Sequence, residues 1–174
     1  MPNTMSAALS ISGVITEILT GDRDGDLSLM PAALRNYRVS KQSDSGGAVI
    51  AYRDVRTGVA SSQTVDYDLI GTLTDAAGNA LNFDLVFLIV LVNTSASSLT
   101  SPILIGPKAS SSLTTGPWAD ASDRSRANHS NGIVWLYNPS GWAVSAGSDI
   151  FSVETPGSGS GYSWDIAILG KDNA

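Results

Sequence analysis

The chain has 174 residues, no cysteine, and 16 acidic residues against 10 basic ones, which gives a formal net charge of −6. The lack of cysteine excludes thiolate metal sites, thiol nucleophiles and disulfide bonds, and a chain of this length buries enough surface to fold without them. Because nucleic-acid binding depends on Lys and Arg that neutralise phosphates, the acidic balance argues against a nucleic-acid partner.

The N-terminus has neither the basic start nor the apolar core of a signal peptide. Residues 1–9 are mostly small or polar, with little to anchor them, so we expect a flexible N-terminal arm followed by one β-sandwich domain over residues 10–174. The first expected strand, residues 8–19, alternates apolar residues such as Leu9 with Ser and Thr. The alternation shifts near Gly13, which indicates a bulge or a bend.

The next segment, residues 29–39, does not clearly predict either a helix or another structure. Its apolar residues have helical spacing, but Pro31 and Asn36 weaken the case for a helix. Residues 48–55 and 63–73 are typical of strands.

Two of the expected strands differ in how they are buried. In residues 63–73, Val65, Tyr67 and Leu69 alternate with polar residues, which predicts a half-buried strand. Residues 83–92 are almost entirely apolar, which predicts a central strand covered on both faces, as in a sandwich core or at an interface. This apolar run is too short for a membrane helix, which needs about 20 residues, so we expect no membrane partner.

The rest of the chain continues as short strands separated by turns. Residues 108–131 form a long polar loop. The further expected strands are residues 102–106, 132–137, 150–154 and 162–169, and the expected turns are residues 75–79, 138–141 and 156–161. The pattern predicts an all-β fold: a single-domain, jelly-roll-like β-sandwich or barrel of about eight short antiparallel strands.

The sequence shows no catalytic constellation. His129 is its single histidine, and no Gly-x-Ser-x-Gly elbow accompanies it. The carboxylates available for glycoside hydrolysis are Asp66, Asp68, Asp84, Asp149, Glu154 and Asp165, which the sequence cannot bring together. We therefore expect that the protein is not an enzyme and that it has no catalytic residue, no cofactor site and no metal site.

One acidic segment has some features of a calcium-binding loop. Asp22, Asp24 and Asp26 have the spacing of carboxylates that converge on a hard cation. A helical calcium loop would continue with Gly and Glu where this chain has Leu27 and Ala33. Two alternatives remain open: a solvated turn, which is the simpler one, or a looser calcium site in a β-loop.

The tryptophans divide into two groups. Trp135 and Trp164 fall inside expected strands, which predicts that both rings lie at least partly in the core. Trp118 and Trp142 are flanked by turns, which predicts exposed rings that act as interface anchors or as a platform for sugars. The interface candidates are Trp118, Trp142, Leu9 and Ile11.

Residues 67–83 (YDLIGTLTDAAGNALNF) resemble a pattern in small β-rich virion proteins of tailed bacteriophages and prophages. Similar landmarks follow in the same order at residues 93–95, 142–147 and 162–170. The chain departs from the family where Ser130-Asn-Gly132 replaces an expected Pro-Gly-Gly turn, and its N-terminal third matches poorly.

The resemblance implies a virion structural protein, in its concrete form a capsid decoration (cement) protein. Such a protein binds the outer surface of the lattice of the major capsid protein and stabilises the head against the pressure of packaged DNA. It would be assembled in the host cytoplasm and located on the capsid surface. We expect a homo-oligomer, most simply a trimer, that contacts the major capsid protein. A head fibre, a tail component or a host-sugar-binding virion module is the alternative.

Overall fold

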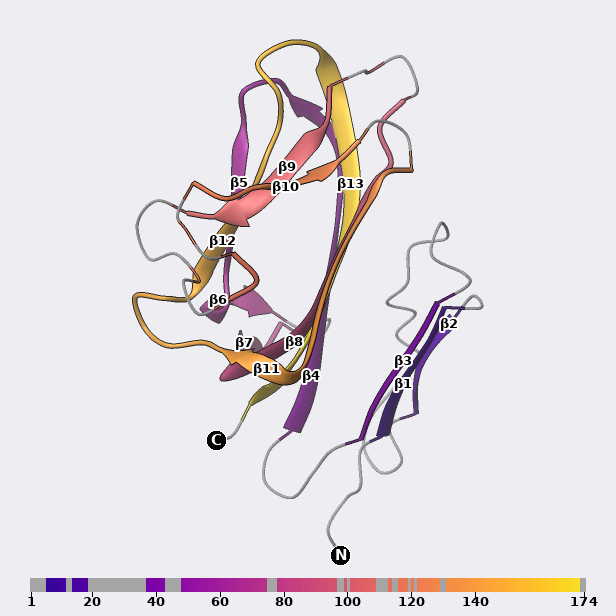
Figure 1. Cartoon of the computed structure of the whole chain (residues 1–174), viewed down its shortest axis with the longest axis vertical. Coiled ribbons are helices and arrows are strands. Elements are labelled where there is room, and N and C mark those ends of the chain that lie inside the picture. Colours follow the sequence, from indigo (N-terminus) through magenta and orange to yellow (C-terminus); the bar gives the residue numbers. More distant parts are fainter. Residues whose placement is uncertain are drawn as a thin grey trace, which may run out of the picture.

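The computed structural model describes residues 6–11, 14–18, 37–42, 48–74, 78–96, 99, 101–108, 113, 116–118, 120, 122–128 and 131–172, with side chains from residue 50 to residue 171 of these. Over this part, the chain forms antiparallel β-sheets and no helix (Figure 1). The described residues accordingly contain no helix that is long and apolar enough to cross a membrane. The all-β prediction is confirmed.

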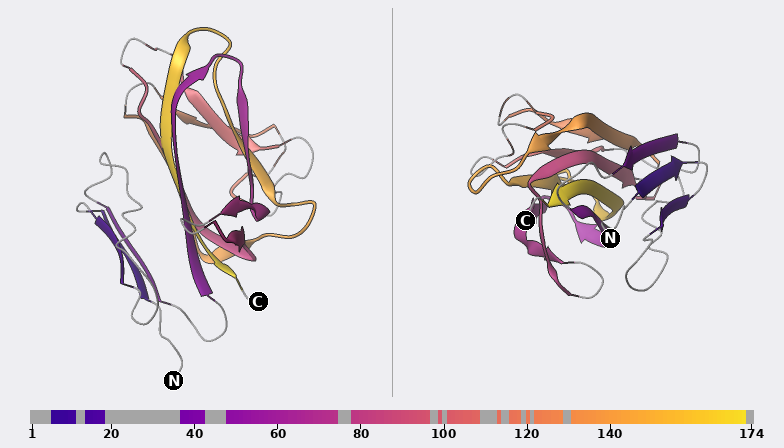
Figure 2. Two further views of the ribbon diagram at one scale, coloured as in Figure 1. Left: turned by 180° about the vertical axis from the view of Figure 1, so that it is seen from behind. Right: turned by 90° about the horizontal axis from the view of Figure 1, so that it is seen from below.

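Two four-stranded sheets stack face to face as a sandwich (Figures 1 and 2). The sheet with the order β11-β8-β13-β4 is here named the long sheet, and the sheet with the order β10-β9-β12-β5 the short sheet. The long sheet consists of β4 (Ala48–Ala60), β8 (Leu85–Asn93), β11 (Ile133–Ala143) and β13 (Ser160–Asp172). The short sheet consists of β5 (Thr64–Asp68), β9 (Ile103–Pro107), β10 (Ser125–Ala127) and β12 (Ile150–Glu154).

The connections between these strands are jelly-roll-like. The chain changes sheet at every step along the sandwich except from β9 to β10. Numbered one to eight along the chain, the strands are ordered 6-3-8-1 in the long sheet and 5-4-7-2 in the short sheet. A small hairpin of β6 (Ile70–Thr74) and β7 (Ala80–Asn82) is inserted between β5 and β8. The predicted sandwich of about eight antiparallel strands is confirmed.

The core lies between the two sheets. Its largest fully buried side chains include Trp164 of β13, Tyr67 of β5 and Phe151 of β12. The rings of Tyr67 and Phe151 are stacked with 5.2 Å between their centroids. As predicted, Tyr67 and Leu69 are buried while Asp66, which precedes Tyr67, is exposed, and β8 is buried on both faces.

Local details differ from the expected elements at three places. The expected strand over residues 63–73 breaks at Leu69, because β5 enters the short sheet whereas β6 pairs only with β7. The expected turn at residues 138–141 lies inside β11 as a bulge, where the pairing with β8 shifts between Tyr137 and Trp142. Gly141 permits it with a φ of +81°, a conformation that other residues rarely adopt. The long loop also contains a strand, β10.

The N-terminal strands form a separate three-stranded sheet with the order β2-β1-β3. Its strands are β1 (Ser6–Ile11), β2 (Val14–Ile18) and β3 (Tyr37–Gln42). The shift near Gly13 is a reversal of the chain and not a bulge, because Ser10 pairs with Val14 in an antiparallel hairpin. The N-terminal part of the ambiguous segment, residues 29–36, lies outside the described residues.

Residues 6–9 therefore belong to a strand, and residues 1–5 lie outside the described part. The division into an arm over residues 1–9 and one domain over residues 10–174 stays a prediction. In Figures 1 and 2, the N-terminal sheet is drawn alongside the long sheet, on the side away from the short sheet.

Candidate interaction faces

Backbone register decides which residues of the long sheet face outward. Ile89 and Leu91 of β8 pair with Ile168 and Ile166 of β13, and all four belong to the core. Successive residues of a strand point to opposite faces, so the residues between these four lie on the outer face. The outer face consists of three cross-strand rows: Tyr137–Leu88–Leu169–Ala51, Trp135–Val90–Ala167–Arg53 and Ile133–Val92–Asp165–Val55.

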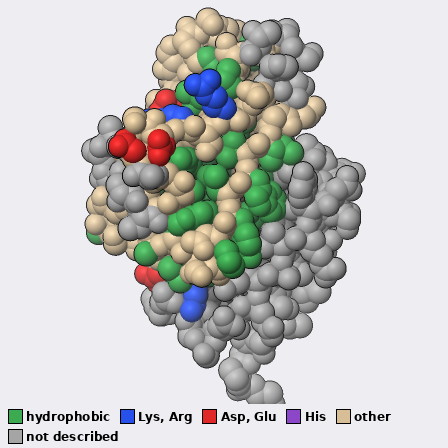
Figure 3. All heavy atoms as spheres, in the orientation of Figure 1, with side chains coloured by type: hydrophobic (Ala, Val, Ile, Leu, Met, Phe, Trp, Pro, Cys, Tyr) green, Lys and Arg blue, Asp and Glu red, His purple; other side chains and the backbone are tan. Residues whose placement is uncertain are grey.

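This outer face is apolar at all but two positions, Arg53 and Asp165. Its centre is buried: the exposed fraction is 0% for Val90 and Val92, and 1% for Leu88. Its margins are open, with Val55 51% and Tyr137 40% exposed. Figure 3 shows hydrophobic side chains gathered in a band where the long sheet is seen edge-on. The sequence predicted burial on both faces of β8, but an apolar strand does not reveal what covers its second face.

The two charged residues of the outer face form a bidentate ion pair. Arg53 donates from Nε to Oδ1 of Asp165 at 3.0 Å and from Nη2 to Oδ2 at 2.6 Å. Asp165 is only 5% exposed. The hydrogen bond from Arg53 raises the pKa of its guanidinium, against the opposing effect of partial burial. A carboxylate in apolar surroundings is strongly destabilised without such a partner.

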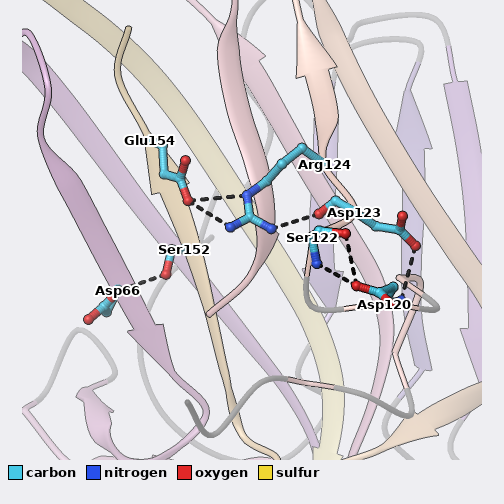
Figure 4. A network of polar contacts seen from close by, with 7 residues as sticks. All are labelled: Asp66, Asp120, Ser122, Asp123, Arg124, Ser152 and Glu154. Atoms are coloured by element: carbon cyan, nitrogen blue, oxygen red, sulfur yellow. Dashed lines mark hydrogen bonds and ion pairs between the residues drawn. The ribbon is translucent and has the colours of Figure 1, made fainter. Parts of the chain in front are cut away.

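The outer face of the short sheet has a different chemistry. Asp66 accepts a hydrogen bond from the buried Ser152 hydroxyl at 2.7 Å and pairs with Lys108 Nζ at 2.5 Å. Partial burial raises the pKa of Asp66, but the hydrogen bonds from Lys108 and Ser152 outweigh it and lower this pKa overall. Arg124 donates from Nε and Nη2 to Oε1 of Glu154, at 3.1 and 3.0 Å (Figure 4).

A loop crosses the short sheet at Gly106. A Cβ atom at this position would lie 2.4 Å from the Asp123 carbonyl oxygen and 2.5 Å from Cδ of Arg124. Asp120 stabilises the loop by accepting hydrogen bonds from the Ser122 backbone and hydroxyl, both at 2.8 Å (Figure 4). The backbone hydrogen bond and then the hydroxyl lower the pKa of Asp120.

The predicted exposure of Trp118 is wrong. Its side chain is 3% exposed, its ring centroid lies 5.9 Å from that of Phe151, and its Nε1 donates to Ser125 Oγ at 3.3 Å. The polar loop carries this ring into the core together with Leu113, so polar neighbours in the sequence did not indicate an exposed side chain.

The other interface candidates lie in strands of different sheets. Trp142 is half-buried and packs against the core from β11, opposite Val86. Leu9 and Ile11 lie in β1, where Leu9 pairs with Ile15 and Val39. With Trp118 buried, the two predicted exposed tryptophans do not form an aromatic platform. Their interface roles stay predictions.

The remaining candidates do not converge on one site. His129 and the calcium candidates Asp22, Asp24 and Asp26 lie outside the described residues. Among the residues that the structure describes, no group of three His, Cys, Asp or Glu residues is arranged to hold a metal ion. Of the carboxylate candidates, Asp66, Glu154 and Asp165 are in ion pairs. Asp149 has one buried oxygen, Oδ1, without a hydrogen-bond partner.

No protein-family model and no curated protein matches the chain. Solved structures are similar at a distance. A chain from the structure described as "Bacillus endospore appendages form a novel family of disulfide-linked pili" is 7% identical, with a TM-score of 0.41, over 76% of this chain and 96% of that one. A chain from the "Cyanophage Pam1 capsid asymmetric unit" is 14% identical, with a TM-score of 0.36, over 87% of this chain and 99% of that one. Similarities this distant do not assign a function.

Proposed function

We propose that this protein is a structural component of a tailed-bacteriophage virion, and specifically a capsid decoration protein. The observation that carries the proposal is the open apolar margin of the long sheet's outer face, where Val55 is 51% and Tyr137 40% exposed. The sequence resemblance of residues 67–83 and of the later landmarks supports the virion context. Sandwiches with jelly-roll connections serve in viral capsids, which is support by analogy of fold.

The ion-paired carboxylates of the two sheets fit a protein that acts by binding and not by catalysis. A general acid or base needs a carboxylate whose proton affinity is tuned and which can reach a substrate. The carboxylates of Asp66, Glu154 and Asp165 are instead held by Lys108, Arg124 and Arg53, respectively. Such ion pairs hold the carboxylate side chains in fixed positions. We therefore propose that the protein is no enzyme and requires no cofactor.

Its partners in this proposal are other copies of itself, in a homotrimer, and the major capsid protein. Neither nucleic acid nor a membrane is among them, in keeping with the net charge of −6. The open margin residues Tyr137 and Val55, with the half-buried Trp142 of the same sheet, are the proposed contact anchors. Many copies, each with a modest contact, would together oppose separation of the capsid subunits.

The test is attachment to phage heads that lack this protein. Purified protein should bind such heads and raise the temperature at which they release DNA. Tyr137→Ala should weaken attachment by about 2 kcal/mol if this residue is a hot spot, whereas Ser145→Ala, at another exposed position, should not. Heads that neither bind the protein nor gain stability would refute the decoration role. Location at the tail or on head fibres would favour the alternative virion roles.

A further inference from the structure

The centre of the long sheet's outer face is covered. Val90, Val92 and Leu88 are 0–1% exposed although their strand neighbours Ile89 and Leu91 occupy the core on the opposite face. In a sandwich of two sheets, side chains on an outer face remain open to solvent unless a further layer packs on them. Burial on this scale therefore requires a third layer.

One face of the N-terminal sheet carries an apolar row at its centre and another at one end, with a row of Ala7, Glu17 and Lys41 at the other end. Leu9 pairs with Ile15 on one side and with Val39 on the other, so this cross-strand row is wholly apolar. The adjacent apolar row on the same face is Ile11 with Tyr37. The opposite face is mixed in polarity: it carries Ser10 with Val14 and Arg38, Ala8 with Thr16 and Ser40, and Ser6 with Ile18 and Gln42. A three-stranded sheet with this pattern needs a surface on which to bury its apolar rows.

Chain connectivity places the N-terminal sheet within reach of the outer face. β3 ends at Gln42 and β4, the edge strand of the long sheet, begins at Ala48. The five residues between them span up to about 18 Å, and stacked sheets lie about 10 Å apart. The views from the front and from behind both draw β1, β2 and β3 on the outer side of the long sheet (Figures 1 and 2).

We propose that the N-terminal sheet is a docked third layer, whose Leu9 row covers the outer face of the long sheet of the same chain. The layer shields the centre around Val90 and leaves the margin residues Val55 and Tyr137 open. Without this cover, the protein would expose a continuous apolar patch of the kind that promotes association. This inference does not rest on the proposed virion function.

The test uses thiol labelling of the full-length protein, which has no cysteine of its own. Val90→Cys probes the covered outer face, Val153→Cys probes the core at an equally buried position, and Val55→Cys gives the labelling rate of an open position. Each is combined with Leu9→Asp in the proposed docking row, or with the matched control Ser10→Asp in the adjacent row, which lies on the opposite face of the sheet. The reagent is a small maleimide, and the protein is free of any capsid.

We expect the thiol at position 90 to be protected, and Leu9→Asp to raise its labelling rate by about tenfold or more through local release of the layer. The thiol at position 153 should stay protected, and Ser10→Asp should change neither rate. Hundredfold dilution should leave the protection at position 90 unchanged, because the layer belongs to the same chain. Because no capsid is present, the result is independent of attachment to virions.

Four results would overturn the proposal. The first is that the thiol at position 90 is labelled as fast as the thiol at position 55. The second is that Leu9→Asp raises the labelling rate at position 90 no more than Ser10→Asp does. Protection that disappears on dilution would assign the cover to a second copy. Loss of protection at both positions 90 and 153 would make the N-terminal sheet an integral part of the core and not a docked layer.

Discussion

Trp164 of β13 donates a hydrogen bond from Nε1 to the Tyr67 hydroxyl of β5, at 3.0 Å across the sandwich. The Tyr67 hydroxyl in turn donates to Oδ2 of Asp54 at 3.0 Å, and Arg56 Nε lies 2.6 Å from the same oxygen. A chain of polar contacts thus leads from the core to the exposed Arg56. Burial is the main cause that raises the pKa of Tyr67, so the hydroxyl stays protonated and donates at any ordinary pH.

Tyr67→Phe should lower the free energy of unfolding by about 1–3 kcal/mol, because it leaves the buried Trp164 Nε1 without an acceptor. Equilibrium urea unfolding measures the change. Tyr137→Phe is the matched control, since Tyr137 is 40% exposed, and it should cost less than about 0.5 kcal/mol. Equal losses in the two variants would contradict the role given to the Tyr67 hydroxyl.

Arg53→Met should destabilise the protein more than Lys108→Met. Both changes remove the cation of an ion pair, but Asp165 is 5% exposed whereas the Asp66 side chain is 37% exposed. An unpaired carboxylate in the apolar outer face is expected to cost about 2–4 kcal/mol, against at most about 1 kcal/mol for the open pair. Chemical unfolding of both variants at neutral pH measures the difference, and the reverse order would refute the argument.

The Asp66 pair should make a small acid-sensitive contribution to stability. Since the pKa of Asp66 is lowered in the folded protein, its ionised form stabilises the fold above the unfolded pKa of about 3.9. This contribution is lost as the pH falls through the folded pKa. The difference in unfolding free energy between the wild type and Asp66→Asn should therefore be at most about 1 kcal/mol at neutral pH and should vanish in strong acid. A difference that grew on acidification would have the wrong sign.

Gly106→Ala should displace the loop that crosses the short sheet, because its Cβ would overlap the backbone of Asp123. We expect a loss of about 1–3 kcal/mol together with faster hydrogen exchange at residues 122–124. Gly157→Ala is the control: its nearest neighbour would be Ser62 Oγ at 3.8 Å, an ordinary contact. Equal effects of the two changes would exclude close approach as the reason for Gly106.

Sequence patterns predicted the features that depend on one strand at a time. The alternation of Val65, Tyr67 and Leu69 predicted a strand buried on one face, and the unbroken apolar run of β8 predicted burial on both. Both follow from the period of two that every strand has. The all-β class came from repeating this reasoning along the chain, whereas the first expected strand lies in the N-terminal sheet and β10 was not expected.

Features that depend on two distant segments were not predictable in this way. Trp118 lies among polar residues of a loop, and only the fold brings it against Phe151. The bulge at residues 138–141 has the composition of a turn, and pairing with β8 keeps it inside a strand. The Arg53–Asp165 pair joins residues 112 positions apart. Each requires the register between strands, which no local pattern contains.

The open margin of the long sheet should control self-association. We expect light scattering on the wild type to give three times the mass of one chain, because closed symmetry is the usual way to bury exposed apolar residues. Tyr137→Lys should shift the protein toward monomer, since a charge at this margin opposes burial. Ser145→Lys adds the same charge at another exposed position and should leave the trimer intact. A wild type that remains monomeric at high micromolar concentration would refute the trimer, and equal dissociation by both lysines would show that net charge, and not this margin, governs assembly.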